Sequence, residues 1–294
     1  MASQSRTQAK NPAPQLDNRG GDAPHAPDLY APKRTIEPLP GPDAVTASHV
    51  EQFAELGFLS IHNVLSESAR AAAIDALVGL IVNPPADWTG LQFERSAAEK
   101  LDELDAEAKQ QAVRKLMHYC DLAEPLSAVR DDPTLRSLVS RLMSGREPKC
   151  FQEMALLKGP GGREKPWHQD NAYFALELGE PVVGVWIALD RATVANACMH
   201  VIPGSHRDGP VTHFQRRDWQ ICDTEVVKDA VVACPLEPGG ALLFSGMLHH
   251  GTPTNHSDQR RRALQLHYAP ADAKWTDQEQ RLAVWGDEGK DVEC

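Results

Sequence analysis

The sequence predicts an α+β fold in which helices buttress a β-sandwich or barrel. From about residue 46 to Met143, apolar residues recur at helical spacing, whereas after Met143 short apolar runs alternate with turns rich in Gly, Pro and Asn. With 41% hydrophobic and 24% charged residues, the 294-residue chain can bury a sizeable core. Helices first and strands later, without an internal repeat, favour one unit over two.

The N-terminal segment is predicted to lie outside this unit. Residues 1–42 hold eight of the 22 prolines and few hydrophobic pairs, so they cannot bury enough apolar surface to offset the entropy lost on ordering. We therefore expect a disordered arm over residues 1–42, one folded domain over residues 43–272, and a C-terminal tail over residues 273–294.

The folded domain is predicted to begin with a helix near Thr46. Ser48 and Glu51 have the spacing of a capping box, and Gly57 can end the helix. A short strand from Phe58 to Ile61 is expected next.

Three further helices and six strands follow from apolar spacing. The helical stripes are Ala73, Leu77, Leu80 and Ile81 before Pro84; Val113, Leu116, Met117 and Cys120; and Leu135, Leu138, Val139 and Leu142. The expected strands lie within Phe151–Leu157, Val182–Leu189, Cys198–Ile202, Val226–Cys234, Ala241–Phe244 and Ala263–Tyr268.

Charge and cysteine content restrict the possible partners and compartment. A net charge of −11 repels phosphate backbones and anionic lipids, so we expect neither nucleic acid nor membrane as a partner. No apolar run approaches a membrane span, the first 30 residues lack the apolar core of a signal peptide, and the six cysteines form no C-x-x-C pair. These features predict a cytoplasmic protein.

One His-x-Asp pair stands out as a candidate metal site. Chance predicts about one such pair in this composition, and the chain contains three, beginning at His168, His206 and His256. The last two lie in turn-rich settings, where side-chain direction is not set by a strand. His168 and Asp170 are expected on a strand, where residues two apart leave the same face and can bind one ion.

A second histidine would complete a two-histidine, one-carboxylate triad of the kind that holds non-haem Fe(II). His249 and His250 follow an apolar run that predicts a later strand of the sheet. Adjacent residues on a strand point to opposite faces, so only one of the two is expected to face the metal.

These pieces resemble the phytanoyl-CoA dioxygenase family of Fe(II)/2-oxoglutarate-dependent oxygenases. The resemblance covers roughly residues 46–270, and the spacing of the family pattern from its metal histidine to an asparagine and an arginine selects His250, with Asn255 and Arg261 in register. One position departs, since Asn196-Ala197 stands where the family has Asn-Gly. The matching segments are Trp167-His168-Gln169-Asp170, Val185 to Leu189, Asn196 to His206, and His250-Gly251-Thr252.

The choice of Arg261 also follows from strand periodicity. On a strand, Arg261 shares its face with Ala263, Gln265 and His267, and this face is polar, as a cofactor pocket requires. Arg262 shares the opposite face with residues typical of core packing, namely Leu264, Leu266 and Tyr268.

The resemblance implies a fold, cofactors and site residues. The fold is a double-stranded β-helix, or jelly roll, and His168, Asp170 and His250 are the catalytic metal ligands for Fe(II). Arg261 and Thr252 bind the distal carboxylate of 2-oxoglutarate, Trp186 lines its pocket, and Gln152 and Lys158 lie near the cofactor. The implied reaction uses O2, releases succinate and CO2, and hydroxylates a C–H bond of a small organic metabolite. The carboxylate at Asp170 argues against the halogenating variants of this chemistry.

Two other classes of function stay open at this stage. One is a catalytically silent β-barrel that binds a metal or a carboxylate. The other is a cupin-like metal isomerase or hydrolase that does not use 2-oxoglutarate, and it predicts that loss of Arg261 leaves activity intact.

Overall fold

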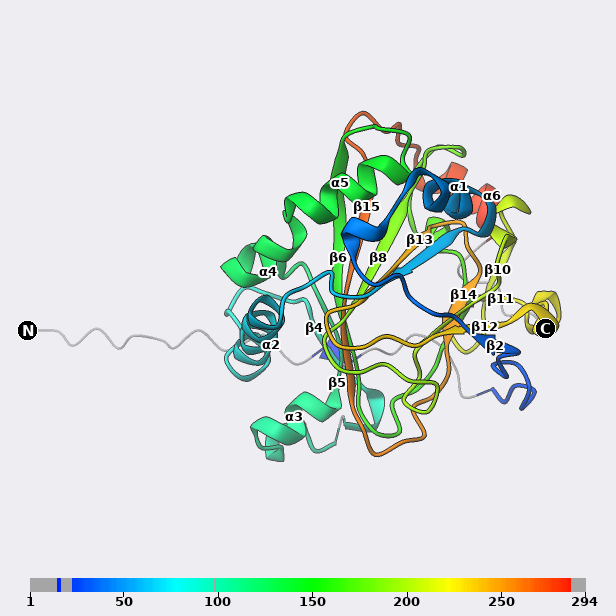
Figure 1. Cartoon of the computed structure of the whole chain (residues 1–294). Helices are drawn as coiled ribbons and strands as arrows, with labels where there is room; N and C mark the ends of the chain where they lie inside the picture. Colours follow the sequence, from blue (N-terminus) through cyan, green and yellow to red (C-terminus); the bar gives the residue numbers. More distant parts are fainter. Residues whose placement is uncertain (1–14, 17–22, 98, 287–294) are drawn as a thin grey trace, which may run out of the picture.

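The computed structural model describes residues 15–16, 23–97 and 99–286, and most of its strands form two facing sheets (Figure 1). The larger sheet is antiparallel except at one edge, where β1 pairs with β4 in parallel. Its eight strands are, in spatial order, β1 (Gln15–Leu16), β4 (Leu91–Phe93), β5 (Val113–Met117), β6 (Pro148–Lys158), β15 (Arg261–Pro270), β8 (Val183–Ala188), β13 (Ala241–Ser245) and β3 (Phe58–Ile61).

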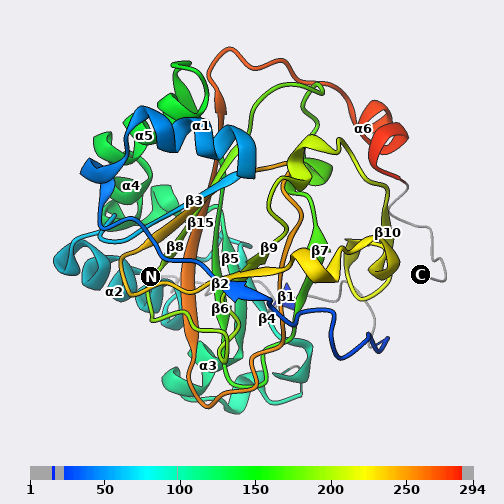
Figure 2. The same cartoon turned by 45° about the vertical axis from the view of Figure 1, so that its right-hand side comes forward.

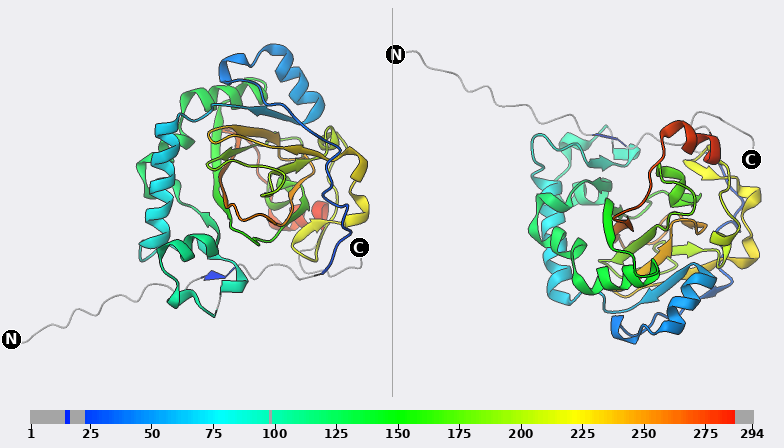
Figure 3. Two further views of the ribbon diagram at one scale, coloured as in Figure 1. Left: turned by 60° about the horizontal axis from the view of Figure 1, so that its bottom comes forward. Right: turned by 90° about the horizontal axis from the view of Figure 1, so that it is seen from above.

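The smaller sheet lies across the interior from the larger one. It has five strands, in the order β2 (Arg34–Thr35), β12 (Val232–Cys234), β9 (Met199–Val201), β14 (His250–Thr252) and β7 (Lys165–His168). A separate hairpin pairs β10 (His213–Gln215) with β11 (Trp219–Ile221). Figure 3 shows the strands enclosing a barrel, the double-stranded β-helix that the sequence predicts, with helices outside it.

Helices cover the outer face of the larger sheet (Figure 2). Ser66 and Asp132 cap two of them, each accepting a hydrogen bond from a main-chain N–H in the first turn. The helices on this side are α1 (Ala47–Leu56), α2 (Glu67–Val82), α3 (Ala106–Ala112), α4 (Glu124–Arg130) and α5 (Pro133–Leu142). The last helix, α6 (Gln278–Trp285), lies apart from them and packs against Trp219 of β11.

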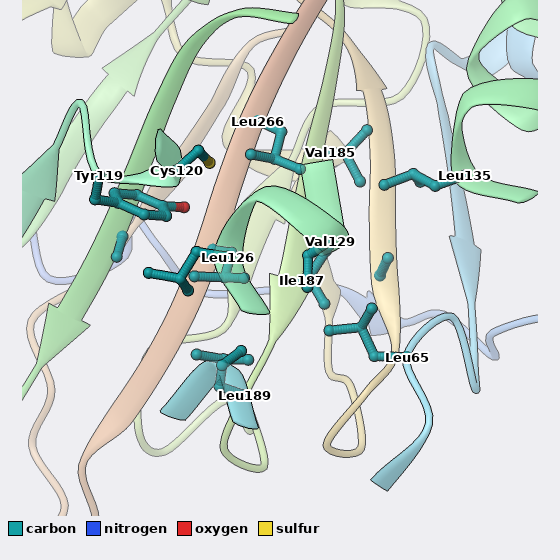
Figure 4. Packing of buried hydrophobic residues seen from close by; sticks show 14 of the residues in the cluster. Leu65, Tyr119, Cys120, Leu126, Val129, Leu135, Val185, Ile187, Leu189 and Leu266 are labelled. Atoms are coloured by element: carbon teal, nitrogen blue, oxygen red, sulfur yellow. The ribbon is translucent and has the colours of Figure 1, made fainter. Parts of the chain in front are cut away.

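The two faces of the larger sheet have different roles. On β8, Val185 and Ile187 pack outward with the helical residues Leu126 and Leu135 in one hydrophobic cluster (Figure 4). Trp186, between them in sequence, belongs to a second cluster between the two sheets. Because side chains alternate along a strand, each strand supplies both the helix-covered core and the barrel interior, where the candidate site lies.

The first helix begins where the sequence predicts, but with a different cap. Thr46 is the N-cap, and its main-chain N–H donates to His49 Nδ1, so the capping box uses Thr46 and His49 and the prediction of Ser48 and Glu51 is wrong. Gly57 ends the helix at φ 84°, a left-handed conformation that glycine adopts without steric cost.

The helix predicted from Val113 to Cys120 is wrong, because Val113–Met117 forms strand β5 and Cys120 opens a short 3-10 turn. Val113 and Leu116 face the helix-covered core, while Lys115 and Met117 line the central cavity. Spacing of three residues fits a strand with a bulge as well as a helix, and β5 pairs with Leu91 to Phe93 across such an irregularity.

The predicted disordered arm is also wrong for residues 23–42. Leu29 and Tyr30 are buried, Tyr30 stacks on Trp167 at a centroid distance of 5.7 Å, and Trp167 Nε1 donates to the Leu29 carbonyl. Strand β2 adds the segment to the smaller sheet. Few hydrophobic residues are enough here because each one meets a partner from the barrel. The rest of the predicted arm, apart from β1, lies outside the described residues.

The turn at Asn196 forms despite the family's glycine being absent. Ala197 adopts φ 70°, the left-handed region that L-residues other than asparagine and aspartate seldom enter. Asn196 holds the turn, since its side chain accepts from Thr193 N–H and donates to the Arg191 carbonyl.

Among the described residues, no helix has the length and apolar character needed to cross a membrane.

Candidate active site

The smaller sheet brings two histidines side by side. His168 ends β7, His250 begins β14, and the two are direct partners across the antiparallel pair, with ring centroids 4.2 Å apart. Asp170 opens a 3-10 turn immediately after β7. The expectation that His168 and Asp170 share one strand face is therefore wrong, because the strand ends first and the turn places the carboxylate beside both rings.

These three side chains have the spacing of metal ligands. Asp170 Oδ1 lies 3.3 Å from His168 Nε2 and 3.6 Å from His250 Nε2, and the three ligand atoms all lie within 4.8 Å of one another. Adjacent ligands that are each about 2.1 Å from one ion lie about 3 Å apart. All three residues are buried, and their donor set is the two-histidine, one-carboxylate set of non-haem iron, so they fit a divalent ion.

The hydrogen bonds of the two rings present the correct nitrogen to an ion. His168 Nδ1 lies 2.7 Å from the Pro166 carbonyl, and His250 Nδ1 lies 2.9 Å from the Leu248 carbonyl. Because a carbonyl only accepts, each Nδ1 carries the proton and each Nε2 keeps its lone pair for a metal.

The other oxygen of the carboxylate, Asp170 Oδ2, is held by two side chains from β15. Gln265 Nε2 lies 3.2 Å and His267 Nε2 2.7 Å from it. Burial opposes ionisation, but His250 and His267 hold the pKa of Asp170 well below its usual range, so the carboxyl is ionised as a ligand must be. Sequence reasoning assigned no role to His267, although it placed the residue on the same polar face as Arg261.

Gln169, between two of the ligands in sequence, ties them to neighbouring loops. Its Nε2 donates to the carbonyls of Gly209 and Met247 at 2.9 and 2.8 Å, and its Oε1 accepts from Val211 N–H. Met247 lies three residues before His250, so one buried amide links both ligand-bearing segments.

Arg261 lies in the same cavity as the three ligands. Its side chain is 2% exposed, its Nε and Nη1 have no hydrogen-bond partner, and no carboxylate among the described residues forms an ion pair with it. Burial lowers the pKa of Arg261 to about 10. A buried guanidinium with unused donors is costly by itself, and it fits a carboxylate ligand that would accept from its planar fork.

Lys158 and Thr252 extend this basic end of the cavity. Lys158 Nζ donates to Thr252 Oγ1 at 2.8 Å and to the Pro253 carbonyl at 2.6 Å. Burial, with Arg261 nearby, keeps the pKa of Lys158 well below its usual range. Two buried basic groups that form no ion pair with any acidic residue in the described part of the chain therefore face one end of the cavity, which fits the dicarboxylate 2-oxoglutarate.

The two remaining predicted residues flank this site. Trp186 is buried beside Arg261, with the guanidinium 5.0 Å from its ring, and its Nε1 has no hydrogen-bond partner within residues 15–16, 23–97 and 99–286. Gln152 lines the cavity from β6, where it is the strand partner of His267. The structure thus places all eight predicted site residues in or against one cavity. Asn255 anchors the loop before Arg261 by donating to three carbonyls, those of Lys158, Gly159 and Gln259.

The sheet also separates the two adjacent histidines, as the strand alternation predicts. His250 faces Asp170, whereas His249 is buried elsewhere and its main-chain N–H is held by Ser205 Oγ. His213 accepts from Gln169 N–H at its Nε2, a structural contact that supports the loop between two ligands.

We expect the metal-free protein to lose stability as the pH falls from 7 to 5. Burial lowers the pKa of four histidines, to about 4 for His200 and His249 and about 3 for His213 and His250. Below pH 6.5 the unfolded chain protonates these residues and the folded chain does not, so the free energy of unfolding falls, by up to about 2 kcal/mol per histidine at pH 5. Urea denaturation at the two pH values measures this, and equal unfolding free energies would contradict it.

Comparison with solved structures places the fold among 2-oxoglutarate-dependent enzymes. EvdO2 from Micromonospora carbonacea var. aurantiaca is 28% identical, with a TM-score of 0.63, over 83% of this chain and 97% of that one. A structure of EvdO2 complexed with 2-oxoglutarate is similar, at 27% identity and a TM-score of 0.58 over the same shares. The epimerase SnoN, in complex with Fe3+, alpha ketoglutarate and nogalamycin RO, shares the fold at 17% identity and a TM-score of 0.63, over 78% of this chain and 84% of that one.

Sequence comparison finds relatives of one family. The chain is 32% identical over 174 residues to phytanoyl-CoA dioxygenase domain-containing protein 1 of Danio rerio, and 33% identical over 176 residues to phytanoyl-CoA dioxygenase of Arabidopsis thaliana. The matches cover 54% and 57% of this chain, and span 58% and 61% of those relatives. The family model for phytanoyl-CoA dioxygenase (PhyH) matches residues 53–263, which include every predicted site residue, and the chain therefore belongs to the phytanoyl-CoA dioxygenase family.

Proposed function

We propose that the protein is a non-haem Fe(II)- and 2-oxoglutarate-dependent dioxygenase that hydroxylates a C–H bond of a small organic metabolite. The observation that carries the proposal is the shared cavity, in which a buried His-Asp-His cluster lies with a buried arginine that has unused donors. Family membership and the 2-oxoglutarate-bound relative support the same chemistry.

Each part of the cavity has a role in this proposal. His168, Asp170 and His250 hold Fe(II), and Arg261 with Thr252 binds the distal carboxylate of 2-oxoglutarate. Iron, 2-oxoglutarate and O2 together supply the oxidising power, with succinate and CO2 as by-products. Lys158 adds positive charge to the carboxylate end. The burial of these groups excludes bulk water.

The substrate is proposed to bind against the apolar part of the cavity wall, which is formed by Met117, Met154 and Phe174 and suits a C–H-bearing carbon skeleton. Met154 is the strand partner of Gln265, four residues along β15 from Arg261. Gln152, a polar residue of the same cavity, can orient a substrate by hydrogen bonding.

A coupled turnover assay tests the proposal. Anaerobically reconstituted protein with Fe(II), 2-oxoglutarate and a metabolite library is exposed to 18O2, and succinate and substrate-derived products are followed by mass spectrometry. We expect succinate formation that depends on one library component, and a product that carries one labelled oxygen. Succinate formed without a labelled product would support 2-oxoglutarate oxidation by the protein but exclude hydroxylation. If no component of the library gives succinate, the proposal is contradicted.

A further inference from the structure

The two oxygens of Asp170 lie in different surroundings. Oδ1 lies 3.3 Å from His168 Nε2 and 3.6 Å from His250 Nε2, and these three atoms would bind the ion. Oδ2 faces β15 and is contacted by Gln265 and His267. The carboxylate therefore presents one oxygen to the candidate metal position and the other to the protein.

The ring of His267 is arranged as a hydrogen-bond donor to this oxygen. His267 is fully buried, and its Nδ1 has no hydrogen-bond partner among the described residues, whereas its Nε2 makes polar contacts with Asp170 and Gln265. The ring packs against Phe174 and Phe151, at centroid distances of 5.0 and 6.3 Å, which fixes its plane. Because the ionised carboxylate accepts, the proton lies on Nε2.

Gln265 supplies the second donor from the same strand face. Its Nε2 lies 3.2 Å from Asp170 Oδ2 and 2.9 Å from His267 Nε2, since both nitrogens converge on one oxygen. Residues 261, 265 and 267 alternate with the helix-covered core residues Leu264 and Leu266, so the period of β15 points all three into the barrel.

We infer that His267 and Gln265 are positioning residues that restrict Asp170 to binding a metal through Oδ1 alone. The inference rests on the proposed iron site. Two hydrogen bonds to Oδ2 oppose the rotation that would bring both carboxylate oxygens to the ion. A one-oxygen carboxylate and two histidines would supply three ligands to Fe(II), and the positions left open would serve the co-substrate and O2. With Arg261 on the same strand, β15 then aligns the metal ligand with the co-substrate.

The inference is tested by measuring metal binding to two variants of His267. In His267→Gln the amide nitrogen can replace the Nε2 donor, whereas His267→Phe keeps a buried ring beside Phe151 and Phe174 but removes the donor. Co(II) is the probe: calorimetry measures its affinity, and the intensity of its visible absorption reports the coordination number. Loss of such an outer hydrogen bond weakens metal binding by about 10–100-fold.

We expect His267→Phe to bind Co(II) at least tenfold more weakly and with an altered absorption spectrum, while His267→Gln stays within about threefold of the parent protein and keeps its spectrum. Parent-like affinity and spectrum in His267→Phe would overturn the inference. Equal damage in both variants would also overturn it, because ring packing would then be responsible.

Two controls separate the positioning role from a folding defect and from failure of the proposed function. Thermal melting of the metal-free variants shows whether they fold, and if His267→Phe does not, Gln265→Met is judged by the same two criteria, since it removes the other donor at similar volume. If the parent protein binds no Co(II), the proposed function is contradicted. If the parent binds Co(II) and neither His267→Phe nor Gln265→Met changes its affinity or spectrum, only the positioning role is contradicted.

Discussion

Replacing Arg261 by methionine is expected to abolish 2-oxoglutarate-dependent turnover and, at the same time, to make the metal-free protein more stable. The guanidinium is proposed to donate two charge-assisted hydrogen bonds to the co-substrate, each contributing about 1.5–3 kcal/mol. Their loss should weaken 2-oxoglutarate binding by about a hundredfold or more. Without the ligand, Arg261 is a buried charge with unused donors, so an apolar side chain of similar length should raise the melting temperature.

The measurements are calorimetric titration of Mn(II)-loaded protein with 2-oxoglutarate and thermal melting of the metal-free protein. Arg260→Met is the matched control, because Arg260 is the preceding residue, its side chain is 30% exposed, and it contacts Glu107 and Gln110 on α3. We expect the control to change neither quantity appreciably. Parent-like turnover in Arg261→Met would favour the metal isomerase or hydrolase that does not use 2-oxoglutarate.

Replacing Asp170 by alanine is expected to abolish metal binding, with a loss of affinity greater than a hundredfold. Asp170 is the one charged ligand in the triad, and removing even an outer hydrogen-bond partner of a ligand costs about 10–100-fold. The donors of Gln265 and His267 would also lose their shared acceptor. Turnover should fall to background with every substrate.

Asp208→Ala is the corresponding control, because Asp208 belongs to the second His-x-Asp pair and is exposed. Co(II) titration of both variants, with circular dichroism to verify folding, gives the comparison. Retention of parent-like Co(II) affinity by Asp170→Ala would place the metal elsewhere and remove the basis of the proposed oxygenase.

Much of the site could be predicted from local sequence because strand alternation is a local property. The period of two residues separates Arg261 from Arg262, and the structure shows the consequence: Arg261 enters the cavity, while Arg262 pairs with Asp190 at 2.7 Å. The same period separates His250 from His249. Family spacing then selects His250 of the two.

Local sequence was insufficient where a segment's state depends on its neighbours. Val113 to Met117 carries spacing compatible with a helix, but pairing with β4 and β6 makes it a strand. Leu29 and Tyr30 form too small a hydrophobic group to fold alone, and Trp167, far along the chain, buries them.

The sequence by itself determined the class of fold, the family, and the candidate ligand set His168, Asp170 and His250, since apolar periodicity and motif spacing depend only on the order of residues. Only the tertiary structure decided that Asp170 lies on a turn and that Gln265 and His267 hold its second oxygen. Those contacts join residues 95 and 97 positions apart, and they exist because two sheets face each other across one cavity. Such a contact depends on how the sheets pack, and no local pattern of residues encodes it.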